Sequence, residues 1–130
     1  IVVFHTGYDP LSPDVYHAKP ENTARVFYAV PEMKMVLAHL GGMYCFDDVE
    51  KYLAGLEGNL YFDTAFLDTN IKAEQLERII KKHGADRILF ASDAPWHEAT
   101  AEIELINSLD LSDEEKEMIF HKNAERLLGI

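Results

Sequence analysis

Histidine and aspartate residues that could bind a metal ion lie within two residues of the ends of short apolar runs of this 130-residue sequence: His5, His39, Asp63 and Asp93. Imidazole nitrogen and carboxylate oxygen are ordinary ligands of Zn²⁺ and similar divalent ions. A metal ion held in this way lowers the pKa of its bound water and polarises a carbonyl group. An aspartate at such a site can both ligate the ion and accept a proton from that water.

Each of these residues also has a purely structural explanation. A histidine at the end of a strand is more often a hydrogen-bonded packing residue than a ligand, and Asp93, which precedes Ala-Pro, could form an Asx turn. Asp63 could support the ligands or only terminate a strand. Gly7, Gly41 and Gly42 suit a backbone that passes close to a metal and a substrate, but they also suit ordinary turns. Two histidines and an aspartate at equivalent ends of consecutive strands would meet at one place, and this coincidence favours a metal site over the separate structural explanations.

The apolar runs are predicted to be strands, because they are too short for helices and turn residues bound them. They cover residues 1–4, 35–38, 60–62 and 88–91. Helical patterns, with apolar residues three or four positions apart, separate the strands. These patterns cover residues 20–31, 46–56, 76–84 and 103–109, and they are followed by a helix that begins at a capping box of residues 112–115 and by a last helix that carries Leu127 and Leu128.

The alternation of strands and helices predicts an α/β fold with a parallel sheet in sequential order and helices on its outer side only. Four such units in 130 residues are half of a (β/α)8 TIM-type barrel, whose usual length is roughly 250 residues. We expect residues 1–130 to form one unit. Function in such folds gathers where the strands end, so the side chains of His5, His39 and Asp93 should converge there.

The order of four short motifs resembles the amidohydrolase-related family that includes aminocarboxymuconate-semialdehyde decarboxylase. The motifs are His-x-Gly at residues 5–7, His-x-Gly-Gly at 39–42, Ser-Asp-x-Pro-Trp at 92–96 and Asn-Ala-x-Arg-Leu-Leu-Gly at 123–129. The resemblance implies that the chain is the C-terminal half of the family's barrel, strands five to eight with their helices. The His-x-His pair on strand one of the family is absent from this sequence.

By this resemblance His5 and Asp93 are metal ligands, on strands five and eight of the family's barrel, and Asp93 is also catalytic. His39 is the strand-six histidine, a catalytic residue that holds the metal-bound water or the substrate. Trp96 lines the substrate pocket together with His39. The tail residues have a structural role, packing the end of the chain against the barrel: Asn123, Ala124, Arg126 and Leu127.

We therefore predict a metal-dependent hydrolase or non-oxidative decarboxylase that acts on a small organic substrate through a metal-activated water. Hydrolysis and decarboxylation share such a metal site, so the sequence does not choose between them. The cofactor would be a divalent metal ion, with Zn²⁺ favoured. The alternative is a catalytically silent half-barrel fragment or assembly module, because the strand-one ligands are missing.

The composition points to a cytoplasmic protein. Twelve Lys and Arg residues against 23 Asp and Glu residues give a formal net charge of −11, which argues against nucleic-acid and membrane partners. Cys45 is the only cysteine, which is typical of a reducing compartment. The apolar start at Ile1 suggests that the sequence is entered at a strand. A half-barrel exposes sheet edges, so we expect a homo-oligomer or the missing N-terminal half of the barrel to cover them.

The remaining histidines carry weaker signals. We expect His17 to be a solvated loop residue and His97, which follows the Ser-Asp-x-Pro-Trp motif, to be exposed. His83 and His121 fall within helical patterns, and we expect both on the surface.

Overall fold

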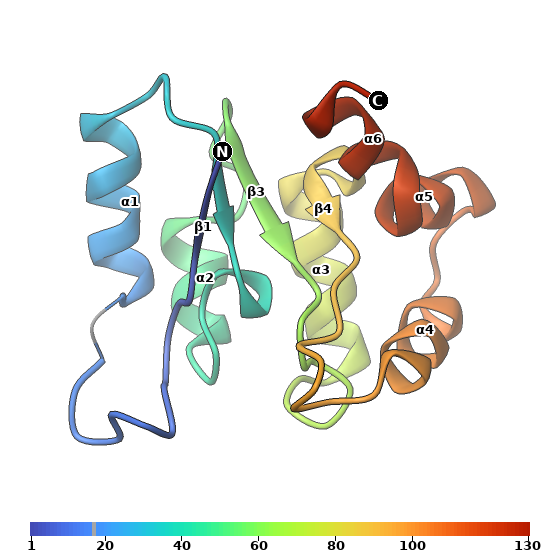
Figure 1. Ribbon diagram of the computed structural model, residues 1–130, viewed down its shortest axis with the longest axis horizontal. Coiled ribbons are helices and arrows are strands. Elements are labelled where there is room, and N and C mark those ends of the chain that lie inside the picture. The colour runs from blue at the N-terminus through green and yellow to red at the C-terminus, as the bar shows by residue number, and fades with distance from the viewer. Residues whose placement is uncertain (17) are drawn as a thin grey trace.

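The computed structural model describes residues 1–16 and 18–130, and a four-stranded parallel sheet lies at its centre (Figure 1). The strands are β1 (Val2–Phe4), β2 (Met35–Leu37), β3 (Leu60–Asp63) and β4 (Ile88–Leu89). Strands that are consecutive in the sequence are neighbours in the sheet, and each pair is parallel. These observations confirm the predicted α/β fold with a parallel sheet in sequential order.

The strand β4 is shorter than the predicted run of residues 88–91, because side-chain hydrogen bonds replace its ladder. The Thr64 hydroxyl accepts from the backbone N–H of Ala91 at 3.0 Å and donates to the Ala91 carbonyl at 2.9 Å. The N–H of Phe90 donates instead to the carbonyl of Ile119 at 2.9 Å. The chain therefore continues in the direction of β4 beyond Leu89, and Asp93 lies at the end of the sheet.

Helices connect the strands and form the tail of the chain. They are α1 (Pro20–Ala29), α2 (Phe46–Tyr52), α3 (Ala73–His83), α4 (Ala99–Ser108), α5 (Asp113–Glu117) and α6 (Asn123–Leu128), with short 3-10 turns η1 (His39–Gly41) and η2 (Ala85–Arg87) and a π-helical turn η3 (Met118–Lys122). Pro20 is the first residue of α1, as expected of a residue without an N–H. Ser112 and Glu115 form the predicted capping box, with the Ser112 side chain accepting from the N–H of Glu115 at 3.2 Å.

Three helices cover one face of the sheet. Phe27 of α1, Val49 of α2 and Ile80 of α3 share one buried core with Leu37 and Phe62 of the strands. Successive residues of a strand point to opposite faces. The neighbours of Leu37 and Phe62 within their own strands therefore belong to the other face. The core that stabilises the sheet therefore lies on the side of α1, α2 and α3.

The helix α6 lies against the opposite face. Val36 and Leu89 of the strands form a second, smaller cluster with Leu127 of α6, and Tyr61 and Ala124 pack against it. Figure 1 shows α6 near the end of the sheet where the strands begin, away from the loops that follow them. The expectation of helices on one side only is therefore wrong for α6, because Leu127 buries its side chain among apolar residues of the other face.

Asn123 anchors this tail. It is fully buried, and its side-chain amide donates to the carbonyls of Ala85 and Ile88, both at 2.7 Å. The Arg126 guanidinium donates to the carbonyl of Asp86. The structural role that the resemblance implies for these tail residues is confirmed.

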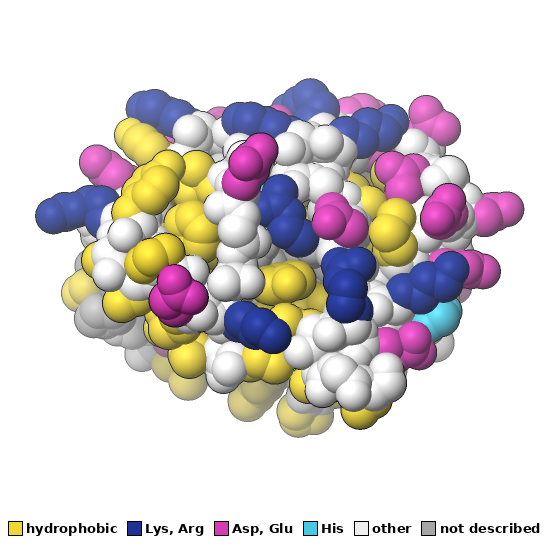
Figure 2. Space-filling model, turned by 90° about the horizontal axis from the view of Figure 1, so that it is seen from above, with side chains coloured by type: hydrophobic (Ala, Val, Ile, Leu, Met, Phe, Trp, Pro, Cys, Tyr) yellow, Lys and Arg dark blue, Asp and Glu magenta, His cyan; other side chains and the backbone are white. Residues whose placement is uncertain are grey.

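The strand β1 forms an edge of the sheet, pairing within the described chain only with β2. Ile1 and Val3 are 58% and 65% exposed. Figure 2, which looks onto the end where the strands begin, shows hydrophobic side chains gathered on the side of α1. Throughout residues 1–16 and 18–130, every helix is too short or too polar to cross a membrane.

Candidate metal and substrate site

Two of the predicted site residues, His5 and His39, are in direct contact. His5 follows β1 and His39 follows β2, and the register that pairs Phe4 with Leu37 brings the ends of these strands side by side. The Nε2 atom of His39 lies 3.1 Å from Nδ1 of His5, and the rings meet edge to face with centroids 4.8 Å apart. The predicted convergence of the two histidines is confirmed.

Backbone contacts between the two loops hold the histidines in place. The N–H of Tyr8 donates to the Met43 carbonyl, and the N–H of Met43 donates to the Thr6 carbonyl, both at 2.9 Å. Gly7 lies between these bonds with φ +85°, and a Cβ atom there would come within 2.2 Å of Met43 N. Gly7 is therefore required for the close approach of two backbones, and this contact explains the glycine two residues after His5.

The two rings belong to a chain of hydrogen bonds between two carbonyl groups. His39 Nδ1 lies 2.9 Å from the Ala65 oxygen, and His5 Nε2 lies 3.0 Å from the Tyr8 oxygen. Carbonyl oxygens only accept, so both outer nitrogens donate. The inner nitrogens, His39 Nε2 and His5 Nδ1, face each other across the contact between the rings.

Asp63 supports His39 from the end of β3. Its Oδ1 accepts from the backbone N–H groups of His39 and Ala65, each at 3.0 Å. Burial raises the pKa of Asp63, and the two N–H donors oppose this effect in part. The nearby carboxylate of Asp93 raises the pKa further. Of its two possible roles, Asp63 therefore has the supporting one.

A cavity of about 590 Å³ brings the predicted site residues together. His5, His39, Asp93 and Trp96 all line it. Asp93 is held at φ +67°, and its carbonyl accepts from the N–H of Trp96 at 2.8 Å. Trp96 is 78% exposed, which places its ring at the open side of the cavity. Within the described residues, the ligand atoms of His5, His39 and Asp93 do not form a set within 4.8 Å of one another.

The sequence of residues 1–130 matches the amidohydrolase family along its whole length. The chain belongs to the amidohydrolase family. No match is found among curated proteins.

Solved structures share the fold of this amidohydrolase chain. A 2,6-dihydroxybenzoate decarboxylase from Rhizobium superposes with a TM-score of 0.64 at 20% identity, over 98% of this chain and 51% of its own. A dihydroxybenzoic acid decarboxylase from Polaromonas sp. JS666, with bound manganese and 2-nitroresorcinol, gives 0.59 at 24% identity, over 80% and 36%. A 5-carboxyvanillate decarboxylase from Sphingomonas paucimobilis gives 0.62 at 19% identity, over 84% and 39%. The chain therefore spans about half or less of the length of these proteins.

Several cavity residues of this amidohydrolase chain were not predicted from the sequence. Tyr8, Tyr44 and Phe66 add aromatic rings to the lining. Each lies within five residues of His5, His39 or Asp63 in the sequence. Proximity to a strand end was the one signal that could have identified them, because aromatic residues in loops have no periodic pattern.

Two histidines differ from the sequence expectation. His83, expected on the surface, is 1% exposed, stacks on Phe62 with centroids 4.0 Å apart and donates to the Leu60 carbonyl at 3.0 Å. Burial, helped by the positive charge of Arg87, lowers the pKa of His83 to about 4. His97, expected to be exposed, has a side chain only 15% exposed. Contacts with distant segments bury both rings, and local patterns do not contain such contacts.

His121 lies on the surface, as predicted, with its ring 3.1 Å from a carboxylate oxygen of Glu125. His17 lies outside the described residues.

Proposed function

We propose that this chain is strands five to eight of a (β/α)8 barrel enzyme, a metal-dependent hydrolase or non-oxidative decarboxylase that acts on a small organic substrate. The observation that carries the proposal is that His5, His39 and Asp93 line the same cavity at the ends of the parallel strands. Membership of the amidohydrolase family supports it. The polar residues stand where enzymes of parallel α/β folds place their active sites.

His5 and Asp93 would hold a divalent metal ion. Their nitrogen and oxygen donors are of the kinds that bind such an ion, and both residues line the cavity. Both ring nitrogens of His5 are hydrogen-bonded in this structure, so its contact with Tyr8 or with His39 would have to open for the ion. When bound, the ion would polarise a substrate oxygen and lower the pKa of a coordinated water. The manganese in the Polaromonas decarboxylase supports a divalent ion, without favouring Zn²⁺ over Mn²⁺. Two donors are too few for a closed site, so further ligands would come from elsewhere.

His39 would move or hold a proton beside the substrate. Asp63 and Ala65 fix its backbone and its Nδ1 atom. Its Nε2 atom faces His5, so a proton on Nε2 can be shared with the neighbouring ring. The fixed ring needs no reorientation during the reaction, which favours proton transfer.

The lining favours an aromatic acid as the substrate and decarboxylation as the reaction. Tyr8, Tyr44, Phe66 and Trp96 surround the cavity, and flat rings stack well on such side chains. The similar structures named above are decarboxylases of dihydroxybenzoates and of 5-carboxyvanillate.

We further propose that a barrel-completing partner covers the open edge at β1. The N-terminal half of the same barrel would supply the missing ligands, whereas a second copy of the chain would cover only the edge and the apolar face. If no partner supplies the missing metal ligands, the chain would be the catalytically silent half-barrel of the alternative hypothesis. We also propose a cytoplasmic location, on the strength of the single cysteine.

The decisive experiment measures CO₂ release from 2,6-dihydroxybenzoate and 5-carboxyvanillate by the full-length protein, after chelation and after addition of Mn²⁺ or Zn²⁺. We expect activity that depends on the metal and falls by at least about 100-fold in His39→Ala and Asp93→Asn. His121→Gln, which changes an exposed histidine, is the matched control and should retain activity. Metal-independent turnover, or wild-type turnover in Asp93→Asn, would refute the proposal.

A further inference from the structure

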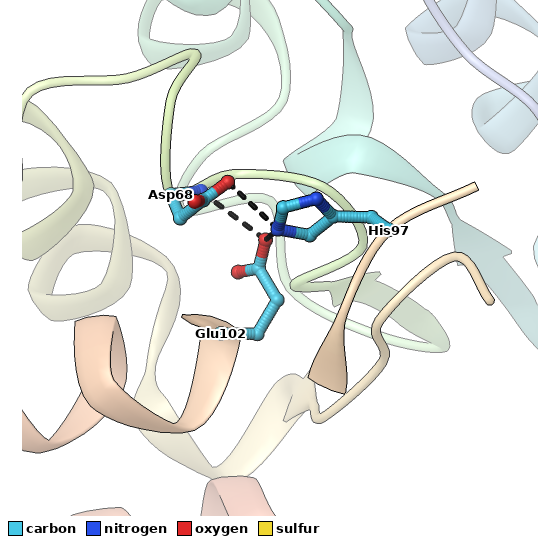
Figure 3. Close-up of side chains that lie close together, drawn as sticks. All are labelled: Asp68, His97 and Glu102. Atoms are coloured by element: carbon cyan, nitrogen blue, oxygen red, sulfur yellow. Dashed lines mark hydrogen bonds and ion pairs between the residues drawn. The ribbon is translucent and has the colours of Figure 1, made fainter. Parts of the chain in front are cut away.

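A second group of metal-ligating side chains lies behind the cavity wall. Asp68 follows β3, His97 follows β4 and Glu102 belongs to the first turn of the ten-residue helix α4. One ligand atom from each lies within 4.8 Å of the other two. Figure 3 shows the three side chains turning their polar ends toward one another.

One polar atom of each side chain in this cluster lacks a hydrogen-bond partner. Among residues 1–16 and 18–130, the buried side-chain nitrogen and oxygen atoms without one are Asp68 Oδ1, His97 Nε2 and Glu102 Oε2. Glu102 is completely buried. Buried polar atoms are almost always hydrogen-bonded, and an exception points to a missing ion or water. All three exceptions fall in this one cluster, which points to a species bound there.

The distances between the three side chains are close to those around a bound metal ion. His97 Nε2 lies 2.9 Å from Asp68 Oδ1 and 3.5 Å from Glu102 Oε1, yet neither contact has hydrogen-bond geometry. Bonds of about 2.0–2.2 Å at the tetrahedral angle place ligand atoms about 3.3–3.6 Å apart. The observed separations are close to that spacing, so a small shift of Asp68 would complete it.

The carboxylates of Asp68 and Glu102 would be balanced by a bound cation. Burial raises the pKa of Glu102, because the charged form loses its hydration. A divalent cation with a neutral His97 balances the two carboxylates completely. Glu102 Oε1 already accepts from the backbone N–H groups of Leu67 and Asp68, at 2.6 and 3.2 Å. These bonds hold the carboxylate in position before any ion binds.

We propose that Asp68, His97 and Glu102 form a second, structural binding site for a divalent cation such as Zn²⁺. The ion would tie the loop after β3 and the segment after β4 to α4. His97 stacks on Phe66 with ring centroids 4.6 Å apart, and Phe66 and Trp96 both line the cavity. The site would therefore stiffen the cavity wall from behind, without contacting the substrate.

Calorimetric titration of Zn²⁺ into chelator-treated full-length protein tests this, in a background that carries His5→Ala and Asp93→Ala. We expect one bound ion to persist in that background, and Asp68→Asn, His97→Gln or Glu102→Gln to weaken it by at least about tenfold. His121→Gln is the matched control, because it changes an exposed histidine that also faces a carboxylate. Absence of binding in the background, or binding unaffected by the three substitutions, would overturn the proposal.

A second measurement needs no variant and so does not depend on their folding. The nitrogen NMR signal of His97 Nε2 should shift to a metal-bound value when Zn²⁺ is added to the unmodified protein. A signal that instead remains that of a protonated imidazolium at every Zn²⁺ concentration would identify the cluster as an ion pair and overturn the metal site. Loss of decarboxylase activity is not a readout here, so the outcome is independent of the function proposed above.

Discussion

The backbone N–H of His39 donates to Oδ1 of Asp63 at 3.0 Å, although the two residues are 24 positions apart in the chain. A carboxylate at the end of β3 thus holds the turn that carries the histidine of the neighbouring strand. The same oxygen accepts from Ala65, whose carbonyl binds the His39 ring. Backbone and ring of His39 are therefore both positioned by the loop after β3.

Replacing Asp63 by alanine should lower the free energy of unfolding by about 2–4 kcal/mol, because it leaves two buried N–H groups without an acceptor. Asp63→Asn keeps an acceptor oxygen and should cost less. Urea unfolding at neutral pH measures both. Equal destabilisation by the two variants would contradict the hydrogen-bonding role.

The raised pKa of Asp63 also predicts a dependence of stability on pH. A buried carboxyl whose pKa is raised by folding binds its proton more tightly in the folded state than in the unfolded one. Its contribution to stability is present below the unfolded pKa and is lost as the pH rises through the folded pKa. Asp63→Asn should remove that loss, which urea titrations across the acid range would detect.

His83 should contribute the opposite slope. Its pKa of about 4 in the folded protein lies below the ordinary value of 6.5, so the unfolded chain binds the proton more readily. Stability should rise between about pH 4 and pH 6.5, by up to about 3 kcal/mol. The slope should diminish in His83→Gln and persist in the exposed-site control His121→Gln. An unchanged slope in His83→Gln would refute the assignment.

Gly7→Ala should destabilise the protein by about 3 kcal/mol or more, because the new Cβ would collide with the Met43 backbone as well as strain φ. Gly129→Ala is the matched control: Gly129 also has positive φ, at +74°, but a Cβ there would meet nothing within 4 Å. It should cost only about 1 kcal/mol. Chemical unfolding of both variants separates the collision from the strain, and similar losses would show that Gly7 is an ordinary turn glycine.

The 130-residue chain by itself should self-associate through its open edge. Val3 is 65% exposed on β1, and Val3→Lys should shift the chain toward monomer by placing a charge in the contact. Val26→Lys on α1, where the valine is 46% exposed, is the control and should leave association unchanged. Sedimentation at micromolar concentration measures both, and a monomeric unmodified chain would contradict the prediction.

The sequence by itself determined the order of the strands, their direction and the ends at which the chemistry stands. These features follow from local patterns: apolar runs of strand length, helical spacing between them, and His5, His39 and Asp93 within two residues of the ends of three of the runs. Parallel strands with short connections bring equivalent ends together, so three residues far apart in the chain could be assigned to one site. The capping box at Ser112 could also be predicted, because its hydrogen bonds join residues three apart.

The tertiary structure alone decided which side chains are buried and with what partners. His83 continues the apolar stripe of α3 and lies under β3, where Leu60 satisfies its N–H. His97 meets Asp68 and Glu102, and α6 packs against the face opposite to the other helices. Each of these contacts joins segments whose separation in the sequence has no periodic signal. A polar side chain is buried only where another segment provides a hydrogen-bonding or charged partner for it. Which segment lies there depends on how the helices and strands pack.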